Sequence, residues 1–209
     1  MSDILQTILN GVSKRLKDMG DGSYAEVVYN ANGGGGGGAS EAHIGEVGGK
    51  TIIAGASVTR PADTNAYAVG DLIANSTTAG SVTPLALTLA RVNQGTGMIR
   101  RARLKVNDTA WLNATVRVHF YKNSPTCTNG DNGAWSTTES EYLGACDVTF
   151  DKSFSDPFVK GIGVPNSGSE INFDCAAASE TIYVLLETRS AVTPGSAKAF
   201  SLVAEVLAN

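Results

Sequence analysis

Residues 98–106, MIRRARLKV, and residues 114–121, ATVRVHFY, decide the fold. Apolar and polar side chains alternate along both stretches, and this period of two is typical of a β-strand with one buried face and one wet face. The apolar positions are Ala102, Leu104 and Val106 in the first stretch and Ala114, Val116, Val118 and Phe120 in the second. The positions between them are Arg101, Arg103 and Lys105, and then Thr115, Arg117, His119 and Tyr121.

Further short segments with the composition of strands follow along the chain, separated by turn residues such as Pro61, Gly80, Gly133 and Gly195. They are residues 51–59, 85–91, 146–150, 181–188 and 199–207. No helical pattern lies between them, so a parallel sheet with crossover helices is disfavoured. The sequence predicts a mainly β domain over residues 51–209, an antiparallel β-sandwich or jelly roll.

The N-terminal part differs from the rest and is expected to form an arm over residues 1–32. A helix is expected over residues 3–18, because the apolar residues there fall on one stripe of a helix. The stripe consists of Ile4, Leu5, Ile8, Leu9, Val12 and Leu16. A short strand is expected over residues 23–29, and the six glycines at positions 33–38 predict a Gly-rich linker over residues 33–50.

Composition excludes several classes of function. The 209 residues carry a net charge of −4 and no long Lys/Arg block, so direct nucleic-acid binding is not expected. No apolar run approaches the roughly 20 residues that span a bilayer, and the N-terminus lacks the uninterrupted apolar stretch of a signal peptide. We therefore expect that the protein is made in a cytoplasm and that it does not associate with a membrane. Cys127, Cys146 and Cys175 are odd in number and widely spaced, which indicates free, partly buried thiols.

The sequence contains no recognisable catalytic or metal-binding motif. His43 and His119 lack neighbouring ligands, and His119 is interpreted as a surface or rim histidine because it has the polar parity of its strand. Asp147, Asp151 and Asp156 could supply a pair of catalytic carboxylates, but solvated loop acids are the favoured interpretation. Residues 129–133, NGDNG, superficially resemble a calcium loop without its alternating acidic ligands. We expect no enzyme activity, no catalytic residues, no cofactor and no metal.

Two groups of residues are candidates for binding a partner. Arg101, Arg103 and Lys105, with Arg117 on a neighbouring strand as a further member, form the densest positive feature of an acidic chain. This face is either simply solvated or docks onto an acidic protein surface. The apolar stripe of the predicted helix either covers the open end of the sandwich or binds a partner, as one helix of a bundle of arms or in a groove of another protein.

Several blocks resemble, in order, a family of virion structural proteins of tailed bacteriophages. Residues 60–73, RPADTNAYAVGDLI, are similar to the opening of that family, and residues 89–92 and 95–99 resemble its next strand, turn and strand. Residues 119–126, HFYKNSPT, lead to the loop at 131–133, and residues 185–189, LLETR, precede a final strand. The resemblance covers about residues 58–209, and residues 21–29 are similar to a short element common in phage structural proteins.

The resemblance implies a protein that is not an enzyme and that decorates or cements the capsid. Its expected partner is the major capsid protein of the same phage, whose neighbouring subunits it would bridge as a homo-oligomer, either a dimer or a trimer. The expected location is the outer capsid surface of the virion, after synthesis in the host cytoplasm. The long glycine run and the loop around Cys127 depart from the family pattern and leave the oligomeric state and the docking surface open.

The alternative is a receptor- or glycan-binding module of a head spike, fibre or tail, because jelly rolls serve both kinds of function. Sugar binding uses exposed aromatic platforms, and Trp111, Trp135 and six tyrosines could build one at most. Trp111 precedes a strand and is expected to pack at the edge of the core. Binding to a glycan array would support this alternative, whereas loss of particle stability without the protein would support decoration.

Overall fold

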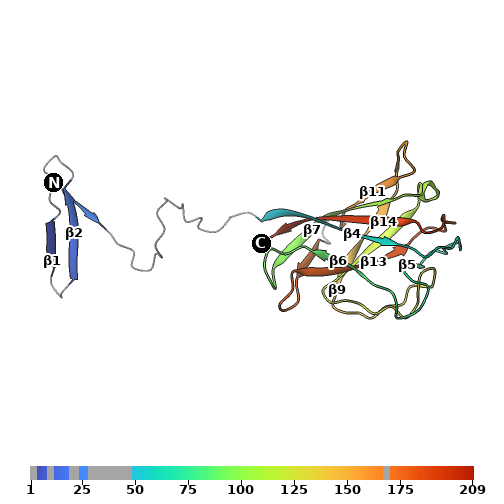
Figure 1. The fold of residues 1–209 in the computed structure, drawn as a ribbon, viewed down its shortest axis with the longest axis horizontal. Coiled ribbons are helices and arrows are strands. Elements are labelled where there is room, and N and C mark those ends of the chain that lie inside the picture. Colours follow the sequence, from blue (N-terminus) through green and yellow to red (C-terminus); the bar gives the residue numbers. More distant parts are fainter. Residues whose placement is uncertain (1–3, 9–11, 19–23, 28–48, 167–169) are drawn as a thin grey trace. The chain divides into compact units, whose positions relative to one another are not determined.

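A computed structural model describes residues 4–8, 12–18, 24–27, 49–166 and 170–209 of the chain. The chain divides into two compact units, Met1–Ile44 and Gly45–Asn209 (Figure 1). The six-glycine run and nearly all of the predicted linker lie outside the described residues.

The N-terminal unit contains three strands and corrects the predicted helix. Strands β1 (Ile4–Ile8), β2 (Val12–Asp18) and β3 (Tyr24–Val27) form an antiparallel sheet in the order β1-β2-β3. A helix over residues 3–18 is therefore wrong, whereas β3 lies within the strand expected over residues 23–29.

The reason for the error is that an apolar spacing of four residues fits both a helical and a strand period. Four is a multiple of two, and the register of β1 and β2 pairs Ile4 with Leu16 and Ile8 with Val12. The sequence also has Asn10-Gly11 between the two stretches, the strongest short hairpin signal. Leu9, the remaining member of the predicted stripe, lies outside the described residues.

The second unit contains two antiparallel sheets. Sheet 1 has the order β10-β11-β7-β14-β4, and β12 also pairs with β7. Its strands are β4 (Lys50–Thr59), β7 (Thr96–Val106), β10 (Lys152–Ser153), β11 (Val159–Gly163), β12 (Ile171–Asp174) and β14 (Ala199–Ala208).

Sheet 2 has the order β5-β13-β8-β9, and β6 also pairs with β13. Its strands are β5 (Leu72–Ile73), β6 (Leu85–Thr88), β8 (Thr115–Tyr121), β9 (Tyr142–Thr149) and β13 (Thr181–Thr188). A short 3-10 helix, Thr109–Trp111, precedes β8. The expected mainly β, antiparallel fold is thus confirmed, although the sequence did not predict β5, β10, β11 or β12.

One hydrophobic core joins the two sheets face to face, which makes the unit sandwich-like. Alternate residues of β7 and β14, such as Leu104 and Leu202, meet alternate residues of β8 and β13, such as Val118 and Val184. Trp111 is fully buried and packs edge-on against Tyr67, Phe150 and Phe200, deeper than the core edge expected for it.

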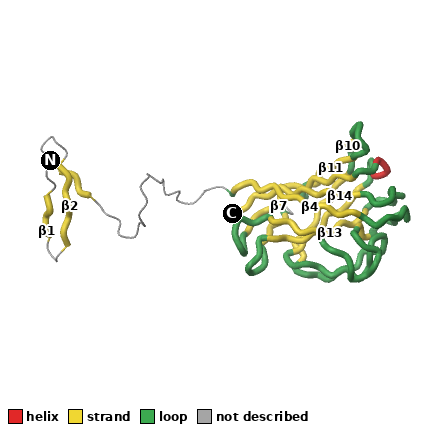
Figure 2. Tube along the Cα trace, in the orientation of Figure 1, coloured by secondary structure: helices red, strands yellow, loops and turns green. Residues whose placement is uncertain are grey.

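The outer faces of the two sheets differ in what covers them. On sheet 2, Tyr121 and Leu185 face outward but are buried, because they pack with Leu72, Ala74 and Cys127 in a second small cluster. Loops run along this side of the unit in Figure 2. On sheet 1, the outward residues of β4 and β14 are nearly all exposed or half-buried. The open face of the sandwich is therefore the outer face of sheet 1.

Candidate functional site

The predicted basic residues of β7 lie on the open face of sheet 1. Arg101, Arg103 and Lys105 point away from the core, while Ala102 and Leu104 between them are buried. A register shift opposite Arg100 adds one residue to β7, so that Arg100 and Arg101 are both exposed. Such a β-bulge re-aims side chains locally, and here it adds a further cation beside the face.

Two of the three predicted cations share one internal partner. Glu205 on β14 lies beside β7, and its carboxylate binds Arg101 Nε through Oε2 and Arg103 Nη2 through Oε1, the latter at 3.0 Å. The hydrogen bond from Arg101 lowers the pKa of the Glu205 carboxyl. Much of the charge of this arginine pair is therefore balanced within the sheet.

Lysine side chains form a row across three strands at the other end of this face. The register places Lys152 of β10 opposite Lys160 of β11, and Lys160 opposite Lys105 of β7. Residues directly opposite each other in an antiparallel pair have Cβ atoms about 4.5–5.5 Å apart. Within the described part of the chain, none of the three ammonium groups forms an ion pair with a carboxylate. We call Lys152, Lys160 and Lys105 the lysine row.

Aromatic rings hold two members of the lysine row. The ammonium of Lys160 lies 4.6 Å from the ring centroid of Phe154, and that of Lys105 lies 5.1 Å from the ring centroid of Phe158. Both distances are within the range of a cation–π contact. The rings restrict the two side chains without cancelling their charge.

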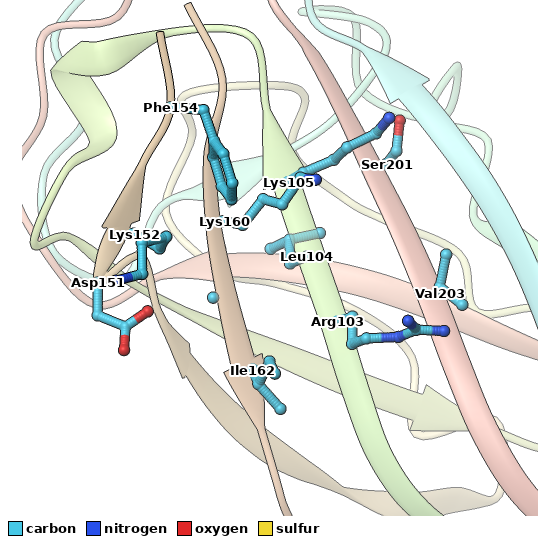
Figure 3. Close-up of a pocket in the computed structure, with 11 residues that line it drawn as sticks. Arg103, Leu104, Lys105, Asp151, Lys152, Phe154, Lys160, Ile162, Ser201 and Val203 are labelled. Atoms are coloured by element: carbon cyan, nitrogen blue, oxygen red, sulfur yellow. The ribbon is translucent and has the colours of Figure 1, made fainter. Parts of the chain in front are cut away.

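A groove of about 480 Å³ runs along the lysine row (Figure 3). Its lining joins the charged residues to apolar ones from β11 and β14, because the register aligns Ile162, Arg103 and Val203 in a second row. Ile162 is 59% exposed and adds apolar surface to the charged lining of the groove. Asp151 is the one carboxylate among the lining residues.

Arg117 does not join this face, because β8 belongs to sheet 2. Its guanidinium instead binds Asp147 on β9 through two hydrogen bonds of 2.7 and 2.8 Å. This contact lowers the pKa of the Asp147 carboxyl. Of the three candidate catalytic carboxylates, Asp147 is thus held by an arginine, Asp151 lines the groove and Asp156 lies exposed.

His119 is buried, which corrects its interpretation as a surface or rim histidine. The ring stacks on Trp135 with centroids 4.1 Å apart, and its nitrogens lie 2.9 Å from Glu187 Oε2 and 3.1 Å from the Tyr142 hydroxyl. Burial lowers the pKa of His119, and the hydrogen bond to Glu187 opposes this effect only in part. His119 does face away from the core, as the alternation of its strand predicts, but the loop that carries Trp135 covers that side of the sheet.

A buried polar network connects two of the blocks that carry the family resemblance. Arg60 Nη2 lies 3.1 Å from Asp131 Oδ2 with both side chains fully buried, and Arg60 Nε donates to the Tyr67 hydroxyl at 2.9 Å. The Tyr67 hydroxyl donates to Asp131 Oδ1 at 2.6 Å, as does the backbone N–H of Ala74 at 2.7 Å. Burial and the neighbouring Asp131 raise the pKa of Tyr67, so it keeps the proton that it donates.

This network also explains the loop at residues 129–133. Asp131 is occupied by protein donors, so it is a structural residue of the sandwich and not a free calcium ligand. Among the described residues, no group of three or more His, Cys, Asp or Glu side chains is placed to hold a metal ion.

The three thiols are free and buried, more so than the partial burial expected. Burial raises the pKa of Cys127 to about 11 and that of Cys146 to about 12. Cys175 shifts in the same direction for the same reason. These thiols are therefore poor nucleophiles and poor metal ligands at neutral pH.

Lys152 and Lys160 were not predicted as site residues, because β10 and β11 were not predicted as strands. A signal was nevertheless present in residues 159–163, VKGIG, where Lys160 and Ile162 alternate with smaller residues. Gly161 and Gly163 obscured this alternation, because glycine is uncommon inside strands.

Comparison with known proteins adds no family assignment. No family model matches the chain, and none of the curated proteins matches it. In the described part of the chain, no helix is long and apolar enough to cross a membrane.

Proposed function

We propose that the protein is a structural component of a tailed-phage particle that decorates or cements the outer surface of the capsid. It binds the major capsid protein and bridges neighbouring subunits. The resemblance of residues 58–209 to phage virion proteins supports this function. The observation that carries it is the contrast between the loop-covered sheet 2 and the open, charged outer face of sheet 1.

The strand order supports a jelly roll as the finer description of the sandwich. The sandwich can be counted as eight strands numbered in chain order. The order across sheet 1 is then first, eighth, third and sixth, where β4 is the first strand, β14 the eighth, β7 the third, and β11 with β12 the sixth. Sheet 2 reads second-seventh-fourth-fifth, with β5 and β6 second, β13 seventh, β8 fourth and β9 fifth. Viral capsid domains and lectins both use the eight-stranded jelly roll, so this order suits capsid decoration and glycan binding alike.

The division of the chain into two units supports bridging. A protein with two compact bodies can contact two neighbouring shell subunits, and the second contact then forms at a high effective concentration. Self-association as a dimer or trimer would multiply these contacts further. In this proposal the sandwich is the rigid body, and the three-stranded N-terminal unit takes the gripping role expected of the predicted helix.

The test is co-sedimentation of the purified protein with capsids that lack it. The full-length chain is compared with a chain that starts at Ser40 and retains the whole sandwich. We expect the full-length protein to saturate the shells and the shorter chain to bind more weakly, because it loses one of two contacts. If neither protein binds, decoration is abandoned.

A receptor- or glycan-binding function is the second candidate, and one observation favours it. Trp135, His119 and Tyr142 form an aromatic cluster on sheet 2, and Tyr142 is 44% exposed. Exposed rings of this kind can stack on a sugar. Binding to a glycan array that is lost in Tyr142→Ala would establish this function, whereas an array without signal would remove it.

A further inference from the structure

The lysine row breaks a rule of sheet stability, and among the described residues no carboxylate forms an ion pair with it. Like charges directly opposite each other on neighbouring strands destabilise a sheet. Lys152, Lys160 and Lys105 nevertheless stand in cross-strand register on three adjacent strands. By contrast, Arg101 and Arg103 on the same face have Glu205 between them. Departures from local rules of this kind are expected at functional sites.

The lysine row is prepared for an external anion. Phe154 and Phe158 hold the ammonium groups of Lys160 and Lys105, which reduces the side-chain freedom that binding would otherwise remove. The charges remain available, because a cation–π contact does not neutralise them. The groove beside the row has room for several side chains of a partner.

The apolar row next to the lysines indicates what kind of anion fits. Ile162 and Val203 lie two residues along their strands from the lysine row, a distance of about 7 Å. Phe154, which is 45% exposed, lies at the other side of the groove (Figure 3). A ligand that presents only charge would leave these apolar surfaces in water. A protein segment with carboxylates beside an apolar side chain would cover both.

We infer that the groove between β10, β11, β7 and β14 is the docking site for an acidic protein segment that also carries an apolar anchor. The lysine row binds its carboxylates, and Ile162, Val203 and Phe154 contact its apolar side chain. This inference rests on the proposed function, in which the segment belongs to the capsid protein. It assigns the docking surface to one side of sheet 1 and the leading contacts to Lys105 together with Lys152 and Lys160, two lysines that the sequence did not single out.

Charge variants on one protein background test the site. The double variant Lys105→Gln/Lys160→Gln removes two charges of the row, and Lys105→Arg/Lys160→Arg keeps them. Lys50→Gln, at the start of β4, is the control for loss of a lysine elsewhere on sheet 1. All of these side chains are exposed, and urea unfolding verifies that each variant folds.

We expect the Gln double variant to bind capsid shells about tenfold more weakly than the wild type, with a smaller dependence on salt. The Arg double variant and Lys50→Gln should bind like the wild type. Ile162→Ser should also weaken binding but keep the salt dependence. If the wild type and the Gln double variant bind shells equally well, the docking site is wrong while the decorating function stands.

A second measurement separates this inference from the function itself. A labelled peptide in which Glu and Leu alternate, heparin, and a single-stranded oligothymidylate are titrated against the wild type and the Gln double variant. Lysine-dependent binding of the peptide that exceeds binding of the other two polymers supports an acidic protein partner, even if shells are not bound. Tighter lysine-dependent binding of heparin or of the oligonucleotide overturns it, as does the absence of binding to all three.

Discussion

Arg60 and Asp131 lie 71 positions apart in the sequence and form an ion pair whose two side chains are completely buried. Arg60 follows β4 and Asp131 belongs to the loop over sheet 2, so the pair ties the end of one sheet to the cover of the other. Tyr67 and Asp63 complete the set of side-chain partners around the guanidinium. If one of these four side chains were removed, the donors or acceptors that it binds would lose their hydrogen-bond partner away from water.

Asp131→Asn is expected to lower the free energy of unfolding by about 3 kcal/mol. The substitution keeps the shape of the side chain but leaves the buried charge of Arg60 with Asp63 alone, and an uncompensated buried charge is costly. Urea unfolding monitored by tryptophan fluorescence measures the effect. The exposed Asp156 provides the control, because Asp156→Asn should change the free energy by less than about 0.5 kcal/mol. Equal effects of the two variants would show that the buried pair adds nothing specific.

The stability of the sandwich should fall as the pH drops below about 6.5. The pKa of His119 is lowered in the folded state, mainly by burial, whereas an unfolded histidine titrates near 6.5. Between these two values the unfolded chain binds a proton that the folded protein excludes, so acid favours unfolding. His119→Gln should remove this part of the pH dependence in thermal unfolding scans from pH 5 to 8. His43→Gln should retain it, and a slope that is unchanged in His119→Gln would assign it to other groups.

Gly161→Ala should destabilise the contact between the two sheets. A Cβ atom at this position would lie 2.1 Å from the backbone oxygen of Thr149, so β11 could not approach β9 as closely as it does. We expect a loss of roughly 1–3 kcal/mol, the usual cost of overpacking. Ile162→Ala, at the neighbouring exposed position, is the matched control and should have a much smaller effect. Calorimetric melting temperatures of the two variants decide between these outcomes.

The N-terminal unit should give a β-type spectrum and no helical signal. A peptide of residues 1–44, which contains β1, β2 and β3, is measured by far-UV circular dichroism in water. Ile8 is paired with Val12 in the register of β1 and β2, so Ile8→Lys should reduce the β signal because lysine has a lower strand propensity than isoleucine. A helical spectrum in the wild-type peptide would reinstate the predicted helix.

The sequence predicted those parts of the fold in which local pattern and tertiary environment agree. Alternation in β7 and β8 identified the core positions Leu104 and Val118, because these strands have one face on the core. His119 was misjudged because a polar parity shows only that a residue faces away from the core. Whether water or a loop lies on that side depends on residues such as Trp135, which are distant in sequence.

The candidate site was only partly predictable for a similar reason. Arg103 and Lys105 stand out within one strand, but the lysine row exists only once β10 and β11 are aligned beside β7. Register between distant strands is set by packing and turns, and a single sequence does not contain it explicitly. The N-terminal error had a different origin, since Ile4, Ile8, Val12 and Leu16 satisfy two periodicities at once.

The antiparallel pairing of β4 with β14 brings Lys50 directly opposite Ala208 (Figure 1). Polypeptide attached on either side of the sandwich domain therefore emerges at one end, while Arg60 and its network lie at the other end of β4, about 33 Å away along ten residues. For protein engineering, a second protein fused after Asn209 would therefore leave the sandwich at the same end as the segment that precedes Lys50. The loops around Arg60 lie at the end of β4 opposite to both attachment points.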